Sequence, residues 1–139
     1  MRKQAGAVGP LGDLALDRQP YSQPAAALLD RIQATGHTAF IAWHTVANFH
    51  YLVSRSHGRR SARDFIVELT RFVGVAAGDA QSIRYAASLP MKDFEDAMQV
   101  AAARFCGVSR IVTRNIKDYE RSPIPAITPL QALGHLPTA

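Results

Sequence analysis

The stretch DFEDAMQVAAARFCGVSRIVTRNIKDYE, residues 93–120, places three carboxylates in front of an apolar run and a β-branched segment. An acidic start followed by apolar residues is typical of a helix N-terminus, where the helix dipole favours negative charge. We therefore expect a helix from Asp93 to about Phe105 and a strand over SRIVTRN, residues 109–115.

The rest of the chain alternates helical periodicity with short β-branched runs. Helices are expected over residues 21–36, 43–56, 61–72 and 79–89, with a terminal helical turn at 129–133. Ser61 and Asp79 are the expected caps of two of them. Strands are expected over residues 37–42, 72–77 and 126–128, and a loop over 116–125. This alternation indicates an α/β sandwich around a mainly parallel sheet.

The composition fits one domain over residues 1–139, because 47% hydrophobic residues are enough for a substantial core. No apolar window of about eighteen residues exists, and the N-terminus has no apolar signal region. We expect a cytoplasmic protein without a membrane span. The single cysteine, Cys106, excludes an internal disulfide and leaves a cysteine-based zinc site short of ligands.

The formal charge of +5 comes mostly from arginine, and four arginines crowd the segment RSHGRRSAR, residues 55–63. The carboxylates instead crowd residues 93–120. A cationic rim beside an anionic centre suits an enzyme that acts on phosphodiesters. A solvated basic turn explains the arginines equally well.

On a helical wheel, Asp93 and Asp96 share one flank of an apolar stripe, whereas Glu95 lies on the other flank. The expected stripe consists of Phe94, Ala97, Met98, Ala101 and Phe105. Capping and the helix dipole explain either aspartate alone.

The carboxyl end of the following strand carries Thr113, Asn115 and Asp118 to the edge where parallel sheets bind ligands. We expect Asp93, Asp96, Asn115 and Asp118 to face one cleft. Oxygen ligands alone suit Mg²⁺ or Mn²⁺. Arg114 is the arginine best placed for phosphate, and the alternatives are an ion pair for Arg114 and turn roles for Asn115 and Asp118.

Residues 89–133, LPMKDFEDAMQVAAARFCGVSRIVTRNIKDYERSPIPAITPLQAL, resemble the C-terminal half of PIN-domain proteins of the VapC-like or PilT N-terminal-like group. That group has an acidic DFEDA-type helix start, a small-residue helix and a TRN-x-x-DF segment, in which Tyr119 replaces the last aromatic. A weaker resemblance extends coverage to about residues 13–136.

The resemblance implies a three-layer α/β/α domain and a Mg²⁺- or Mn²⁺-dependent endoribonuclease, the toxin of a VapBC-like pair. Its implied partners are RNA, a VapB-like antitoxin and a second copy in a homodimer. Asp96 corresponds to the best metal ligand, Asp93 to a neighbouring or supporting carboxylate, and Asp118 to a ligand held directly or through water. Thr113 and Asn115 correspond to residues that orient water or phosphate.

The N-terminus departs from the family, which begins with a strand in a D-T-N-V-L-L-D-like pattern. Asp13 aligns with the second acid and Ala7 with the first, the central metal ligand, while Asn48 stands at the next acidic position. Pro10 and Gly12 are expected to spoil the strand, so residues 1–12 are atypical.

Three interpretations of the N-terminus stay open. The start is divergent, shifted or altered; Asp13 or Asp17 substitutes for the lost ligand; or the domain is catalytically silent and works by binding. The leading hypothesis is the metal-dependent ribonuclease, and the alternative is a catalytically impaired module that binds RNA or a protein. The third hypothesis is a generic α/β protein whose acidic residues only cap helices and aid solubility.

Overall fold

The computed structural model describes residues 4–6, 22–35 and 39–135. Its sheet has five short strands in the order β3-β2-β1-β4-β5, and every neighbouring pair is parallel. The strands are β1 (Gln4–Gly6), β2 (Ala39–Ala42), β3 (Gly74–Ala76), β4 (Arg110–Val112) and β5 (Ala126–Ile127). The predicted parallel sheet is therefore confirmed.

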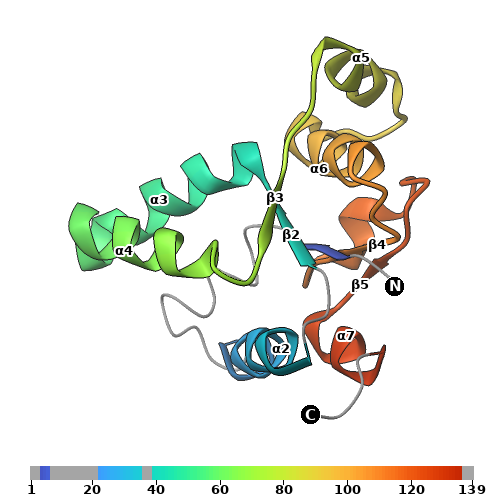
Figure 1. Cartoon of the computed structure of the whole chain (residues 1–139). Coiled ribbons are helices and arrows are strands. Elements are labelled where there is room, and N and C mark those ends of the chain that lie inside the picture. Colours follow the sequence, from blue (N-terminus) through green and yellow to red (C-terminus); the bar gives the residue numbers. More distant parts are fainter. Residues whose placement is uncertain (1–3, 7–21, 36–38, 136–139) are drawn as a thin grey trace.

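Helices cover the sheet in pairs (Figure 1). They are α2 (Ser22–Thr35), α3 (Trp43–His57), α4 (Arg59–Leu69), α5 (Ala80–Ser88), α6 (Phe94–Phe105), the 3₁₀ helix η1 (Ile116–Tyr119) and α7 (Pro129–His135). α2 and α7 lie on one side of the sheet and α5 and α6 on the other, while α3 and α4 form an arm that projects from it. The expected three-layer α/β/α architecture is confirmed. None of the described helices is long and apolar enough to cross a membrane.

The first strand corrects the expectation that the N-terminus is spoiled as β structure. β1 is the central strand, with Gly6 opposite Ile41 of β2 and Val112 of β4. It ends before Pro10 and Gly12 in the sequence, so neither residue interrupts its ladders. Ala7, Asp13 and Asp17 lie outside the described residues.

Two capping predictions have opposite outcomes. Asp79 caps α5, because its carboxylate accepts a hydrogen bond from the Ser82 N–H at 3.0 Å. Ser61 does not cap α4, because that helix already begins at Arg59. Its N-cap is Gly58, which has φ +86° and provides no side-chain cap. Left-handed backbone at that turn suits glycine. The expected loop over 116–125 contains η1.

More of the surface of α6 is buried than the predicted apolar stripe. The buried positions are Ala97, Gln99, Val100, Ala101, Ala102 and Ala103. Phe94 and Phe105, both predicted to be core, are 48% and 55% exposed. Because α6 contacts both α5 and four strands, its small central side chains are enclosed while the aromatic residues at its ends are not.

Replacing Gly74 by alanine should destabilise the sheet. Gly74 of β3 lies opposite Phe40 of β2, and a Cβ at Gly74 would lie 2.7 Å from a carbon of the Phe40 ring. We expect Gly74→Ala to lower the free energy of unfolding by about 1–3 kcal/mol in urea denaturation, because the ring must move. Gly134→Ala is the control, since no described side chain or distant backbone atom lies within 4 Å of its Cβ position. Equal effects of the two changes would contradict this packing constraint.

Candidate active site

Asp93 is the N-cap of α6. Its backbone is extended, and its Oδ1 accepts a hydrogen bond from the Asp96 N–H at 3.0 Å. Glu95 and Asp96 occupy the first helical turn, where the dipole favours carboxylates. The capping interpretation of Asp93 is therefore confirmed, and one of its oxygens is already engaged.

Asp96 is half-buried, and its Oδ1 accepts a hydrogen bond from the Tyr119 hydroxyl at 3.2 Å. Tyr119 belongs to η1 and is 5% exposed. Burial raises the pKa of Tyr119, and the adjacent Asp96 carboxylate raises it further. The tyrosine thus stays a neutral donor that joins η1 to the start of α6.

The Asp96 carboxyl is held in an unfavourable environment for its charge. Burial, and then the Asp93 carboxylate, raise the pKa of Asp96 to about 6. The hydrogen bond from Tyr119 lowers this pKa in part, whereas Asp118 and Glu95 raise it further. Like charges therefore converge on Asp96, and an added cation would relieve their repulsion.

Asp93, Asp96 and Asp118 line one cavity of about 440 Å³. The other charged residues of its lining are Lys92, Lys117, Glu120 and Arg121. Asp118 reaches the cavity from η1 rather than from the end of β4. The structure thus brings together the three predicted carboxylates, and three cationic side chains and one further carboxylate share their cavity.

These carboxylates suit a hard divalent cation by donor type, since Mg²⁺ and Mn²⁺ prefer oxygen ligands. Within residues 4–6, 22–35 and 39–135, however, no three Asp, Glu, His or Cys side chains are placed to hold one metal ion. Mg²⁺ commonly keeps several waters and takes only one or two protein carboxylates. The carboxylates of this cavity therefore suit such an ion by donor type, but they supply only part of its ligands.

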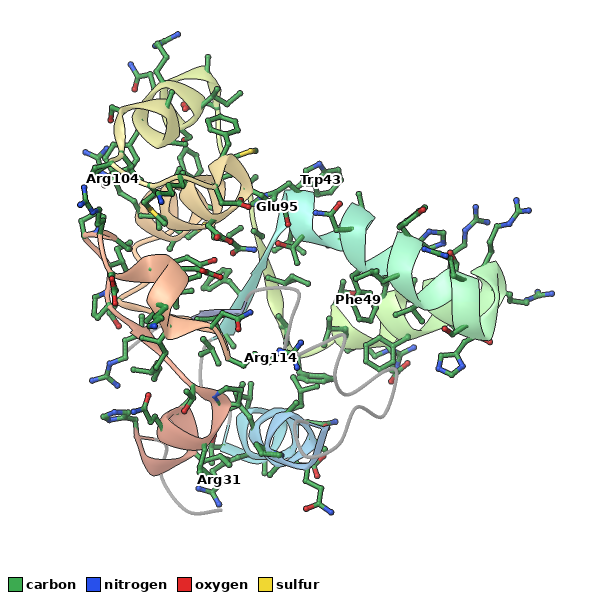
Figure 2. All side chains as sticks on the ribbon, turned by 180° about the vertical axis from the view of Figure 1, so that it is seen from behind. Arg31, Trp43, Phe49, Glu95, Arg104 and Arg114 are labelled. Atoms are coloured by element: carbon green, nitrogen blue, oxygen red, sulfur yellow. The ribbon has the colours of Figure 1, made fainter. Side chains whose placement is uncertain are left out.

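The other predicted site residues do not line this cavity. Thr113 is 4% exposed, and its hydroxyl accepts a hydrogen bond from the Asn115 N–H at 3.1 Å, which fixes the turn between β4 and η1. Asn115 is exposed, and Asn48 is half-buried on α3. Arg114 follows β4 near the middle of the molecule (Figure 2). The predicted single cleft for Asp93, Asp96, Asn115 and Asp118 is thus wrong for Asn115.

A PIN-domain family model matches residues 11–117, which is most of the chain. The chain belongs to the PIN-domain family. No curated protein matches it. Solved structures agree with the assignment, although their sequence identity is low.

DNA-bound VapBC from Salmonella typhimurium matches with 16% identity and a TM-score of 0.70, covering 93% of this chain and 99% of that chain. VapBC2 from Rickettsia felis, bound to a promoter DNA fragment, has 15% identity and a TM-score of 0.67, covering 91% and 98%. Mycobacterium tuberculosis VapC20, a sarcin-ricin loop cleaving toxin, has 19% identity and a TM-score of 0.60, covering 78% and 86%. At these identities the likeness concerns the fold.

In this PIN domain a buried polar contact joins α3 to α6, two helices that no sequence pattern links. The Gln99 side-chain amide donates to the Thr45 hydroxyl, and these residues are 3% and 0% exposed. Gln99 Oε1 is buried without a hydrogen-bond partner among the described residues. Thr45 precedes Asn48 by about one turn, and Gln99 follows Asp96 by about one turn. The contact thus ties together the two helix starts that carry candidate site residues.

Glu95 faces this second helix rather than the cavity, as the wheel predicted. Figure 2 shows it beside the start of α3, where Trp43 lies. Burial lowers the pKa of His44, and the Glu95 carboxylate and backbone offset that shift in part. The acidic residues of the α6 start therefore divide between two environments.

The pH dependence of stability should reveal the strain at Asp96. Its pKa is about 6 in the folded protein against an ordinary 3.8, so the folded state binds the proton more tightly than the unfolded state. Ionisation of Asp96 therefore destabilises the fold, fully above about pH 6 and progressively less down to pH 3.8. Without divalent cations, we expect Asp96→Asn to raise the urea midpoint at pH 7.5, and this gain to vanish near pH 4. Asp64→Asn, an exposed change on α4, is the control. A gain independent of pH would show that Asp96 is not strained by its charge.

The contact between Thr45 and Gln99 should contribute strongly to stability. Thr45→Val keeps the side-chain shape but leaves the buried Gln99 amide unpaired, so we expect a loss of about 1–3 kcal/mol on urea unfolding. Adding Gln99→Met should recover most of that loss, because no unpaired polar group then remains.

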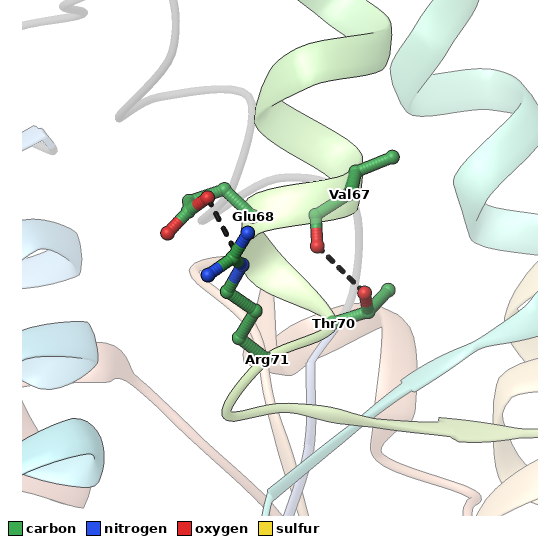
Figure 3. Close-up of polar contacts among 4 residues, drawn as sticks. All are labelled: Val67, Glu68, Thr70 and Arg71. Carbon is green, nitrogen blue, oxygen red and sulfur yellow. Dashed lines mark hydrogen bonds and ion pairs between the residues drawn. The ribbon is translucent and has the colours of Figure 1, made fainter.

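Thr70→Val is the matched control for this prediction. The Thr70 hydroxyl donates to the Val67 carbonyl at 2.6 Å at the exposed end of α4, where water can replace it (Figure 3). We expect a change within about 0.5 kcal/mol there. A similar loss for Thr45→Val and Thr70→Val would contradict a special role for the buried contact.

Proposed function

We propose that this PIN domain is a Mg²⁺- or Mn²⁺-dependent endoribonuclease and the toxin of a VapBC-like toxin-antitoxin pair in the cytoplasm. One observation carries the proposal: Asp93, Asp96 and Asp118 line a single cavity, and burial, followed by the repulsion of neighbouring carboxylates, raises the pKa of Asp96. Such an arrangement costs stability and is expected where charge serves a function. Membership of the PIN-domain family supports the same reading.

In this proposal Asp96 and Asp118 hold the cation, and Asp93 supports them while capping α6. When bound, the ion supplies an activated water and offsets negative charge on the phosphodiester. Tyr119 orients the Asp96 carboxylate through its hydrogen bond.

The remaining residues bind and position the substrate. Lys92, Lys117 and Arg121 line the cavity with positive charge suited to phosphate. Thr113 fixes the turn that presents η1. Asn115, Arg114 and Asn48 are proposed to contact RNA or ordered water near the carboxyl edge of the sheet.

The proposed antitoxin partner is supported by the solved relatives, several of which were crystallised as VapBC complexes. We assign to this chain a VapB-like antitoxin, a homodimeric assembly and a single-stranded RNA substrate. The antitoxin would restrain the nuclease while both proteins are present.

A second candidate is a PIN domain that binds RNA or a protein without cleaving RNA. The specific observation in its favour is that the described residues supply only a partial ligand set. Ala7, which aligns with the expected first-strand aspartate, is not an oxygen ligand.

Cleavage of single-stranded RNA separates the two candidates. We expect cleavage with Mn²⁺ or Mg²⁺, inhibition by EDTA, and a loss on the order of 100-fold in rate for Asp96→Asn, because a metal ligand is removed. Asp64→Asn should leave the rate unchanged. Cation binding, measured as the rise in thermal midpoint with added Mn²⁺, should be lost in Asp96→Asn as well. RNA binding without any metal-dependent cleavage would sink the nuclease and favour the binding module.

A further inference from the structure

Four arginines, Arg55, Arg59, Arg60 and Arg63, crowd the end of the arm formed by α3 and α4, and all four are exposed. We call these residues the arginine tip. No acidic residue lies between Arg55 and Arg63, and the first carboxylate in the sequence after them is Asp64. The tip therefore concentrates positive charge at the end of the arm that projects from the sheet (Figure 1).

None of these four arginines forms an ion pair within the part of the chain that the structure describes. Arg55 instead lies over the Tyr51 ring, 5.6 Å from its centroid. At the opposite end of α4, Arg71 pairs with Glu68 at 3.2 Å (Figure 3). Among the described residues, an ion pair therefore neutralises an arginine just after the C-terminal end of α4, whereas none does so at its N-terminal end.

Arg55 lies in the last turn of α3, where the helix dipole favours a cation, but the arginines of α4 are unfavourably placed. Arg59 and Arg60 occupy the first turn of α4, where the dipole disfavours cations, and that turn has neither an acidic residue nor a side-chain cap. Arg59 and Arg63 are four residues apart on one helix face, so their like charges repel. Features that break local rules without an internal compensation are expected at functional surfaces.

We propose that the arginine tip binds the phosphates of single-stranded RNA, as a second contact remote from the Asp96 cavity. RNA as the ligand rests on the proposed function. Guanidinium groups match phosphate oxygens with two parallel hydrogen bonds. Residues 54–63 themselves carry no large apolar side chain that could anchor a protein interface, and the exposed Tyr51 under Arg55 offers a ring on which a base can stack. The tip therefore fits a repeating anionic backbone better than a protein surface.

The length of α3 gives the scale of the distance from the arm end to α6, the helix that begins at the candidate site. Thr45 touches Gln99 of α6 near the candidate site, and twelve residues of helix separate it from His57 at the arm end. At 1.5 Å per residue this is about 18 Å. A single strand that rises 3.4 Å per nucleotide spans it with about five nucleotides. RNA must exceed this length to reach both contacts, because no residue of α3 lines the Asp96 cavity.

Binding of labelled RNA tests the proposal independently of cleavage. The full chain carries Asp96→Asn throughout, and fluorescence anisotropy follows single-stranded RNAs of 4 and 12 nucleotides against salt concentration. Each lost phosphate contact lowers the slope of log K against log salt by about 0.7 for single strands. We expect R59Q/R63Q to lower the slope for the longer RNA by about 1.4 and its affinity on the order of tenfold at 0.1 M salt. Most of the affinity gain from 4 to 12 nucleotides should disappear.

R71Q/R84Q is the matched control, because it removes the same charge from exposed arginines away from the tip. R59K/R63K should retain most of the slope, since the charges remain. Circular dichroism checks that each variant is folded. Equal effects of R59Q/R63Q and R71Q/R84Q would overturn the proposal, as would binding of a polyglutamate peptide, but not RNA, that depends on the tip.

The nuclease and the tip can fail separately. If the chain without Asp96→Asn cleaves no RNA but tip-dependent RNA binding holds, the nuclease proposal fails and the tip proposal stands. If cleavage occurs with unchanged RNA affinity in R59Q/R63Q, the tip proposal fails alone.

Discussion

The enclosure of α6 between α5 and the sheet is the constraint on which the candidate site depends. Its central side chains are small, so the helix packs against both neighbours without room to shift. This packing fixes where the helix begins. Because Asp96 lies in the first turn, it is half-buried and next to η1, whereas Asp93 stays at the exposed cap. The electrostatics of the site therefore follow from packing.

The protein is basic overall, yet its candidate site gathers negative charge. The carboxylates are held by local bonds: Asp93 by the Asp96 N–H, and Asp96 by Tyr119. Lysine and arginine side chains share the cavity lining, yet the pKa of Asp96 stays raised. A positively charged surface around a small anionic centre attracts a polyanion and still leaves room for a cation.

Local features of α6 were predictable from sequence. The cap at Asp93 and the separation of Asp96 from Glu95 depend on helix periodicity and backbone donors within one turn. The exposure of Phe94 and Phe105 was not predictable, because it depends on where α5 and the sheet end. The contact of Gln99 with Thr45 spans 54 residues, and the one hint was a polar residue within an apolar run. The position of β1 likewise depends on pairing with distant strands rather than on its own composition.

That central position has a consequence for biosynthesis. β1 leaves the ribosome before the other four strands of the sheet, and β2 can pair with one of its edges early. The other edge belongs to β4, so it stays open until Arg110–Val112 has been synthesised. An open central edge invites pairing with other chains. Productive folding is thus completed late in translation, and a nascent chain stalled before β4 would be prone to aggregation.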